Sequence, residues 1–193
     1  DENTILNLKM QKAKIDVWGV GTKLITAYDQ PALGAVYKIV SMEDDKGVMH
    51  DTIKLSNNAE KVSTPGKKQV WRITSRAKGK SEGDYITFAD TDVNALDEIN
   101  MFHPTYTYIN KTVRDFDAVP LLVPIYDKGQ LIYDLPSLDE IKAYATKELD
   151  ELWNEYKRVL NPQDYPVDLA KDVWDNKMTL IDNVRKKAHN LPE

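Results

Sequence analysis

KIDVWGVGTKL, residues 14–24, joins a short apolar run to two glycines one residue apart, and these to a second apolar run. Residues 15–18 (IDVW) predict a strand, Gly19 and Gly21 predict a tight turn, and residues 22–28 (TKLITAY) are long enough for about two helical turns. The residues before this stretch predict a short helix with an acidic first turn and a basic last turn. Helix, strand, glycine turn and helix in this order are typical of a parallel α/β unit.

Such a glycine turn has two possible roles. Its backbone N–H groups can point into one concavity that suits a phosphate, with the Thr22 hydroxyl as a further donor. Alternatively it is only a tight turn, in which Gly19 and Gly21 supply positive φ angles. The residues match neither a Rossmann fingerprint, which needs a third glycine and a later acidic residue, nor a P-loop, which needs Gly-Lys-[Ser/Thr]. From spacing alone, both interpretations stay open.

The composition excludes several classes of protein. The chain has 193 residues, 41% of them hydrophobic, which is enough for a core of ordinary size. Its 26 Lys+Arg against 31 Asp+Glu give a net charge of −5 with the signs interspersed, which argues against nucleic acid as a partner. There is no cysteine, so disulfides and thiolate metal sites are excluded and a reducing compartment is favoured.

The termini and the apolar runs of the chain predict its cellular location. No apolar run approaches the roughly 18 residues of a membrane span, and the N-terminus lacks the features of a signal peptide. We therefore expect a cytoplasmic protein without a membrane partner. The chain begins at Asp1 rather than at methionine, and we interpret this as a cut end.

The middle of the chain predicts a mixed or antiparallel β region. From Gly34 onward, short stretches rich in β-branched and aromatic residues predict strands, with residues 43–47 (EDDKG) as a hairpin loop. Residues 93–99 predict a short helix, and residues 102–116 are ambiguous. The predicted strands are residues 36–42, 48–55, 68–74, 84–88, 121–126 and 131–135.

The last part predicts two helices. Ser137 and Glu140 form a capping box, and apolar residues at spacings of three and four continue to Val159 in one long amphipathic helix. A second helix is predicted to begin with Asp168 as its cap and to continue through Val184. We expect three parts: residues 1–33 with the glycine turn, residues 34–135 as the β region, and residues 136–193 as the C-terminal helices.

Other polar residues give weaker signals. A basic stretch in the β region could face an anion, but nearby acidic residues favour a solvated face; it comprises Lys54, Lys61, Lys67, Lys68, Arg72 and Arg76. The three histidines, His50, His103 and His189, show no metal-ligand spacing, so we expect no metal site. Acidic residues on the long helix lie on its polar side and are poor candidates for catalysis: Asp139, Glu140, Glu148, Asp150 and Glu151. The four tryptophans are expected in the core or an interface.

Several ordered blocks of sequence together resemble one known family. The first block is residues 16–26 (DVWGVGTKLIT), and similar blocks follow along nearly the whole chain. They are residues 31–34 (PALG), 36–38 (VYK), 53–56 (IKLS), 65–72 (PGKKQVWR), 121–124 (LLVP), 135–138 (LPSL), 161–162 (NP) and 165–169 (YPVDL). In this combination the chain resembles the nicotinate phosphoribosyltransferases.

The resemblance implies an activity and a fold. The family couples nicotinate with phosphoribosyl pyrophosphate to give nicotinate mononucleotide and pyrophosphate, assisted by ATP hydrolysis and Mg²⁺, as the entry step of NAD salvage. It implies the C-terminal part of an irregular α/β barrel (strand, glycine turn, helix), then a mixed α+β region and a helical C-terminus. Carried over residue by residue, Gly19, Gly21 and Thr22 bind the 5-phosphate of the phosphoribosyl group. The family also implies a homodimer.

The chain departs from the family in length, since it resembles only the C-terminal part of a member. The base pocket and the catalytic residues belong upstream, so their roles are not assigned to any histidine here. We expect the chain to be inactive alone and to depend on the rest of the same enzyme chain. An alternative is a non-catalytic binding or assembly module derived from the family. A related enzyme acting on another base, such as nicotinamide, is a third interpretation.

Overall fold

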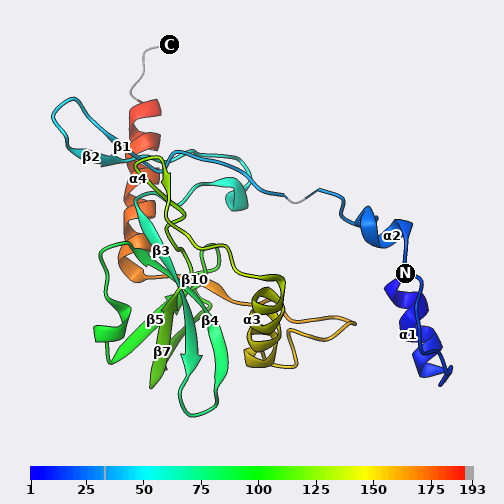
Figure 1. Ribbon diagram of the computed structural model, residues 1–193. Coiled ribbons are helices and arrows are strands. Elements are labelled where there is room, and N and C mark those ends of the chain that lie inside the picture. Colours follow the sequence, from blue (N-terminus) through cyan, green and yellow to red (C-terminus); the bar gives the residue numbers. More distant parts are fainter. Residues whose placement is uncertain (33, 190–193) are drawn as a thin grey trace. The chain divides into compact units, whose positions relative to one another are not determined.

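The computed structural model describes residues 1–32 and 34–189 and divides the chain into two compact units, Asp1–Tyr37 and Lys38–Glu193 (Figure 1). The predicted domain boundary at residue 33 falls outside the described residues. Within the described ranges, no helix is both long and apolar enough to cross a membrane.

The first unit contains two helices, α1 (Glu2–Met10) and α2 (Thr22–Ile25). Asp1 caps α1, because its Oδ1 accepts the Thr4 N–H at 2.9 Å. The predicted strand at residues 15–18 forms no ladder with any described residue, and α2 ends three residues earlier than predicted. A single strand needs a neighbour for its N–H and C=O groups, and this unit provides none.

The second unit is built on a six-stranded sheet. Its spatial order is β6-β5-β10-β4-β3-β7, and every neighbouring pair is antiparallel except β10 with β4. The strands are β3 (Lys68–Ser75), β4 (Lys80–Phe88), β5 (Glu98–Phe102), β6 (Asn110–Arg114), β7 (Phe116–Pro120) and β10 (Val167–Leu169).

The connection between β6 and β7 curls the sheet. These strands form its two opposite edges, yet only Asp115 separates them in sequence. The two edges must therefore approach each other at this point, as in a half-closed barrel. Asp115 makes the corner with a φ of 51°, and its carbonyl accepts the Arg76 N–H at 3.0 Å.

The parallel pairing of β10 depends on a close approach to Gly83. This glycine has a φ of 135°, and a Cβ there would lie 2.9 Å from the Pro166 carbonyl oxygen. The Asp84 N–H donates to the same carbonyl at 2.9 Å. The segment before β10 can therefore lie directly against β4, where a larger residue would hold it away.

The core lies on this sheet and beneath α4 (Lys171–His189), which packs against β4 and β5 (Figure 1). Trp71, Ile86, Phe88 and Trp174 pack around it. The buried apolar residues are Ile73, Tyr85, Val93, Ile99, Met101, Val113, Phe116, Ala118, Leu169, Ala170 and Val173.

Smaller elements complete the unit. The predicted loop at residues 43–47 does join a hairpin, in which Asp44 Oδ1 accepts the N–H groups of Lys46 and Val48 at 2.9 Å. The helix α3 (Leu138–Glu151) begins with the predicted capping box of Ser137 and Glu140. The other elements are β1 (Ser41–Glu43), β2 (Met49–Asp51), the 3₁₀ helices η1 (Ala59–Lys61) and η2 (Val93–Ala95), β8 (Tyr126–Asp127) and β9 (Gln130–Leu131).

Three predicted helix assignments were wrong. Residues 93–99 form η2 and the start of β5 instead of one helix. α3 stops at Glu151 instead of Val159, because Leu152 is extended and the chain turns there. Asp168 lies within β10 and caps no helix, and α4 starts at Lys171.

Candidate glycine-turn site

The glycine turn lies where the extended segment meets α2. Gly21 is the N-cap of this short helix, and its carbonyl accepts the N–H groups of Leu24 and Ile25 at 3.0 and 3.1 Å. Thr22 is the first helical residue, so the hydroxyl that the sequence pointed to lies beside the turn. All three predicted phosphate ligands, Gly19, Gly21 and Thr22, are thus brought together within one turn.

Neither of the usual structural reasons explains these two glycines. The glycines with positive φ are Gly47, Gly66, Gly79, Gly83 and Gly129, so the alternative that Gly19 and Gly21 supply positive φ was wrong. A Cβ added at either residue would meet no described atom within 4 Å. Gly21 is the N-cap of α2, where glycine is among the preferred residues, and a further reason for glycine at both positions is the close approach of another group to the backbone.

A hollow of about 330 Å³ adjoins the turn. Among the described residues, the N–H groups of residues 19–23 and the Thr22 hydroxyl donate to no acceptor. A group with several acceptor oxygens would satisfy these donors. The hollow is lined by Asp1, Thr4, Ile5, Trp18, Gly19, Val20, Gly21, Thr22 and Lys23.

One ion pair lies at the edge of this hollow. Lys23 Nζ is 2.7 Å from Asp1 Oδ2 and lies over the Tyr28 ring at 5.2 Å from its centroid. The ammonium group offsets the Asp1 carboxylate, which alone would repel an anion in the hollow. The site is therefore compatible with a phosphate.

Three residues of the basic stretch, Lys68, Arg72 and Arg76, have partners within the chain. Lys68 Nζ donates to the carbonyls of Thr64 and Pro65 at 2.7 and 3.2 Å. Burial lowers the pKa of Lys68, while the charge of Asp51 raises it. Arg76 pairs with Asp115 and Asp117, so both of these cations already have partners within the chain. These two cations are therefore used within the fold.

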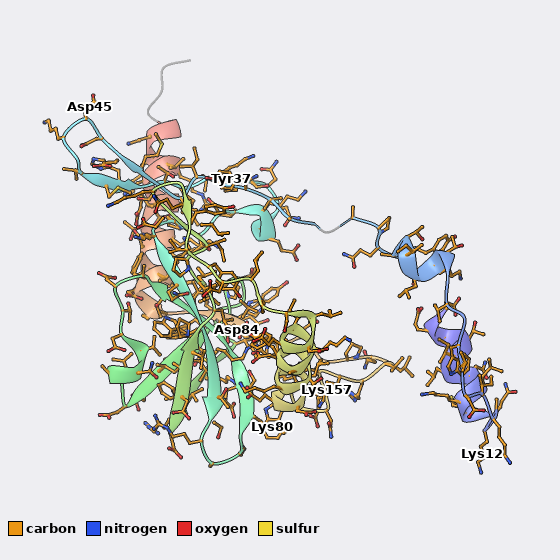
Figure 2. The ribbon with its side chains drawn as sticks, in the orientation of Figure 1. Lys12, Tyr37, Asp45, Lys80, Asp84 and Lys157 are labelled. Atoms are coloured by element: carbon orange, nitrogen blue, oxygen red, sulfur yellow. The ribbon has the colours of Figure 1, made fainter. Side chains whose placement is uncertain are left out.

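Arg72 is the centre of a charged network that sequence reasoning missed. Its guanidinium binds both oxygens of Asp84 on the facing strand, with Nε at 3.0 Å and Nη2 at 3.3 Å, and it also binds Glu148 of α3. The hydrogen bonds that Arg72 donates to Asp84 raise the pKa of Arg72 further above its usual range. Figure 2 shows Asp84 on the part of β4 that adjoins α3.

Tyr165 completes the network. Its hydroxyl donates to Asp84 Oδ1 at 2.9 Å and lies 2.6 Å from Ser81 Oγ, while its ring packs edge-on against Tyr156. Burial raises the pKa of Tyr165 to about 12, so the phenol stays protonated and can act as a donor. A network of this kind fixes α3 and the segment before β10 on the sheet.

Comparison with known proteins identifies the family. A model described as the nicotinate phosphoribosyltransferase C-terminal domain matches residues 67–177. The chain belongs to the nicotinate phosphoribosyltransferase family. It is 54% identical over 187 residues to nicotinate phosphoribosyltransferase of Bacillus subtilis (strain 168), covering 97% of this chain and 38% of that protein. It is 31% identical over 171 residues to human nicotinate phosphoribosyltransferase, covering 89% of this chain and 31% of that protein.

A solved structure agrees with this nicotinate phosphoribosyltransferase assignment. The crystal structure of human nicotinic acid phosphoribosyltransferase matches with a TM-score of 0.56 and 28% identity, over 62% of this chain and 24% of that one. The chain therefore spans less than two fifths of the length of the Bacillus and human relatives. The mixed α/β fold with its curled sheet agrees with the expected C-terminal region of the family.

The family model covers only one of two regions, the Arg72 network and the glycine turn. The residues of this chain that the family model matches, 67–177, run from the residue before β3 into α4, and so include the Arg72 network. The glycine turn lies outside that range. The alignment to the Bacillus relative, in contrast, covers 97% of this chain, and residues 19–22 lie within it.

The histidines form no metal site in the described part of the chain, where no group of three His, Asp or Glu residues could hold an ion. His50 Nε2 lies 2.8 Å from Asp44 Oδ2 in the β1–β2 hairpin. His103 Nδ1 accepts the N–H groups of Thr105 and Tyr106, which fixes the loop after β5. The side chain of His189 lies outside the described residues.

Proposed function

We propose that the full-length protein carrying this chain couples nicotinate with phosphoribosyl pyrophosphate, giving nicotinate mononucleotide and pyrophosphate in NAD salvage. The support is family membership together with relatives named nicotinate phosphoribosyltransferase. This chain's own contribution is the glycine turn. The observation that carries this assignment is that the N–H groups of the glycine turn have no acceptor among the described residues. In addition, neither Gly19 nor Gly21 has a positive φ, and a Cβ at either residue would meet no described atom within 4 Å.

In this proposal, Gly19, Gly21 and Thr22 bind the 5-phosphate of the phosphoribosyl group. The reaction develops positive charge on the ribosyl C1, so the enzyme gains by holding the sugar in one position. A phosphate held by several backbone N–H groups is fixed in position and in orientation. Glycine at residues 19 and 21 leaves room for the oxygens to reach these N–H groups.

The rest of the site is proposed to lie outside this chain. Among the described residues, no group of three His, Asp or Glu side chains could hold Mg²⁺. Because the chain spans only part of its relatives, we expect it to be inactive alone, and to act as part of a cytoplasmic homodimer. The alternative of a non-catalytic module derived from the family is tested by assaying the purified full-length protein for nicotinate mononucleotide.

The substitution Gly21→Val tests the phosphate assignment. A valine side chain would block the approach of phosphate oxygens, so the affinity of the full-length protein for phosphoribosyl pyrophosphate should fall by about 2–3 kcal/mol, roughly 30- to 150-fold. Titration calorimetry measures this directly. Since a Cβ at Gly21 meets no described atom, the fold should be retained, as circular dichroism would show.

Gly34→Val is a matched control. Gly34 also has no described atom within 4 Å of an added Cβ, but it does not line the hollow. This variant should bind phosphoribosyl pyrophosphate like the parent protein. Equal affinities for both variants and the parent would refute the assignment of Gly21.

A further inference from the structure

The loop after β5, residues 104–109, is held closed by the side chain of His103. The ring nitrogen Nδ1 accepts the backbone N–H groups of Thr105 and Tyr106 at 3.1 and 2.9 Å. The His103 N–H donates to the Ile109 carbonyl at 3.0 Å, and the Ile109 N–H donates to the Tyr106 carbonyl at 2.8 Å. The imidazole is thus the acceptor around which the chain turns between β5 and β6. We call residues 104–109 the His103 loop.

These contacts fix the protonation state of the ring. An N–H group can donate only to a nitrogen with a lone pair, so Nδ1 of His103 carries no proton and the proton of the neutral ring lies on Nε2. In the imidazolium form both ring nitrogens are donors, and an Nδ1–H would face two backbone N–H groups. Binding of a second proton therefore removes both hydrogen bonds at once. Because the closed loop binds one proton fewer than the released loop can, acid favours release.

A buried carboxylate lies beside His103. Leu169 pairs with Phe102 in the antiparallel register of β10 and β5. The next residues along this register, Asp168 and His103, are therefore neighbours across the two strands. Asp168 is only 5% exposed, and no described residue donates a hydrogen bond to its carboxylate. Burial raises the pKa of Asp168, while the charges of His103 and Lys111 lower it.

The other cation near this carboxylate already has a partner. Lys111 of β6 donates to the carbonyl of Glu82 and to its Oε2, the latter at 3.1 Å. On the loop side His103 meets uncharged rings: the centroid of Tyr106 lies at 5.1 Å, and Tyr108 follows at 6.1 Å from Tyr106. A charge on His103 is thus opposed by the loop N–H groups and stabilised by the buried carboxylate.

We propose that His103 is a proton-controlled switch: the neutral ring holds the His103 loop closed, and the protonated ring releases the loop and pairs with Asp168. Tyr106 and Tyr108 are already 53% and 80% exposed, so the loop can open without uncovering the core. Histidine changes its charge between about pH 5 and 8, so the end of the β5–β6 hairpin should respond to pH in this range while the rest of the sheet does not. This inference is independent of the proposed function.

Hydrogen–deuterium exchange of the full-length protein tests the proposal, with protection factors corrected for the intrinsic effect of pH. The peptide that contains the His103 loop should lose protection about tenfold between about pH 8 and about pH 5, because two hydrogen bonds are lost. The β1–β2 hairpin is an internal control. There His50 Nε2 lies 2.8 Å from Asp44 Oδ2, and a proton on His50 strengthens that contact, so protection of the hairpin should not fall.

Four substitutions separate the hydrogen bonds from the charge. In His103→Asn, the side-chain Oδ1 can accept the same two N–H groups without titrating, so the loop should stay protected across the pH range. His103→Phe retains a ring without an acceptor and should leave the loop unprotected at every pH. His103→Lys carries a charge and only donors, and should open the loop at neutral pH. Asp168→Asn retains the acceptor but removes the stabilising carboxylate, and should move the release to lower pH.

Equal protection of the His103 loop at about pH 8 and about pH 5 would overturn the proposal. A pH response of His103→Asn equal to that of the parent would assign the response to another group, and would also overturn it. If every peptide of the parent loses protection together in acid, the whole protein unfolds, and His103→Lys at neutral pH then decides. An unprotected loop in that folded variant supports the proposal, and a protected loop overturns it.

Discussion

Replacing Arg72 by methionine should destabilise the sheet unit strongly. The side chains of Arg72, Asp84 and Glu148 are only 20%, 13% and 18% exposed, and Arg72 is the cation that both carboxylates share. Glu148 also lies 3.7 Å from Lys147, but that lysine is 66% exposed and compensates the charge weakly. Methionine retains much of the apolar volume but removes the charge and the donors. The variant would leave two partly buried negative charges facing the same space.

The magnitude follows from these exposures. Removing one partner of a fully buried ion pair typically costs 3–5 kcal/mol, because an uncompensated charge remains. The network keeps some contact with water, which reduces the penalty, and we expect a loss of about 2–4 kcal/mol in the free energy of unfolding. Urea denaturation followed by tryptophan fluorescence measures this loss.

Removal of the two carboxylate charges provides a second, independent signature. A penalty caused only by lost packing would remain when both carboxylates are replaced by amides. The triple variant Arg72→Met, Asp84→Asn, Glu148→Gln should recover much of the lost stability at neutral pH.

Arg76→Met is the matched control on the same strand. Arg76 pairs with Asp115 and Asp117, but all three side chains are more than half exposed, so the variant should show no measurable change. If Arg72→Met were as stable as Arg76→Met, or if the triple variant recovered none of the lost stability, the argument from uncompensated charge would be refuted.

Two further predictions concern α3 and α4. Ser137→Ala removes the N-cap of α3 and should cost about 1 kcal/mol, seen as faster amide hydrogen exchange in the first turn of α3, whereas Ser137→Asp should keep the protection. Lys177 is only 6% exposed, and burial lowers its pKa below the ordinary value of 10.5. At pH values between the lowered pKa and 10.5, the folded state therefore binds fewer protons than the unfolded state. Stability should therefore rise with pH across that window, and Lys177→Met should abolish the rise while stabilising the protein by about 1 kcal/mol at pH 7; a slope that persists in the variant would contradict this.

Local signals in the sequence predicted local structure well. Ser137 and Glu140 specify the start of α3 through contacts only three residues apart, and the structure has the capping box as expected. Residues 43–47 likewise contain their own turn chemistry, with Asp44 accepting nearby N–H groups. In both cases, the interactions that decide the conformation lie within a few residues of each other along the chain.

Structure that depends on pairing between distant segments could not be predicted from such local signals. Residues 167–169 are too short to show a strand pattern, and they become β10 only because β4 and β5 lie on either side. Asp168 looked like a helix cap because aspartate favours that role, but its neighbours in space are Tyr85 and the β5 strand. Arg72 could not be distinguished from the other basic residues until the register placed Asp84 opposite it.

Glycine gives information about function only after its structural uses have been accounted for. Gly83 has a positive φ and lies against Pro166, so the fold alone explains it. Gly19 and Gly21 have neither property, and they occur in a segment whose predicted strand has no partner among the described residues. A group that approaches the backbone at these glycines is either a ligand or another part of the polypeptide. Phosphoribosyl pyrophosphate affinity separates these two causes: a ligand requires Gly21→Val to weaken binding while the fold is retained, whereas close packing of another segment requires the same variant to lose stability even without substrate.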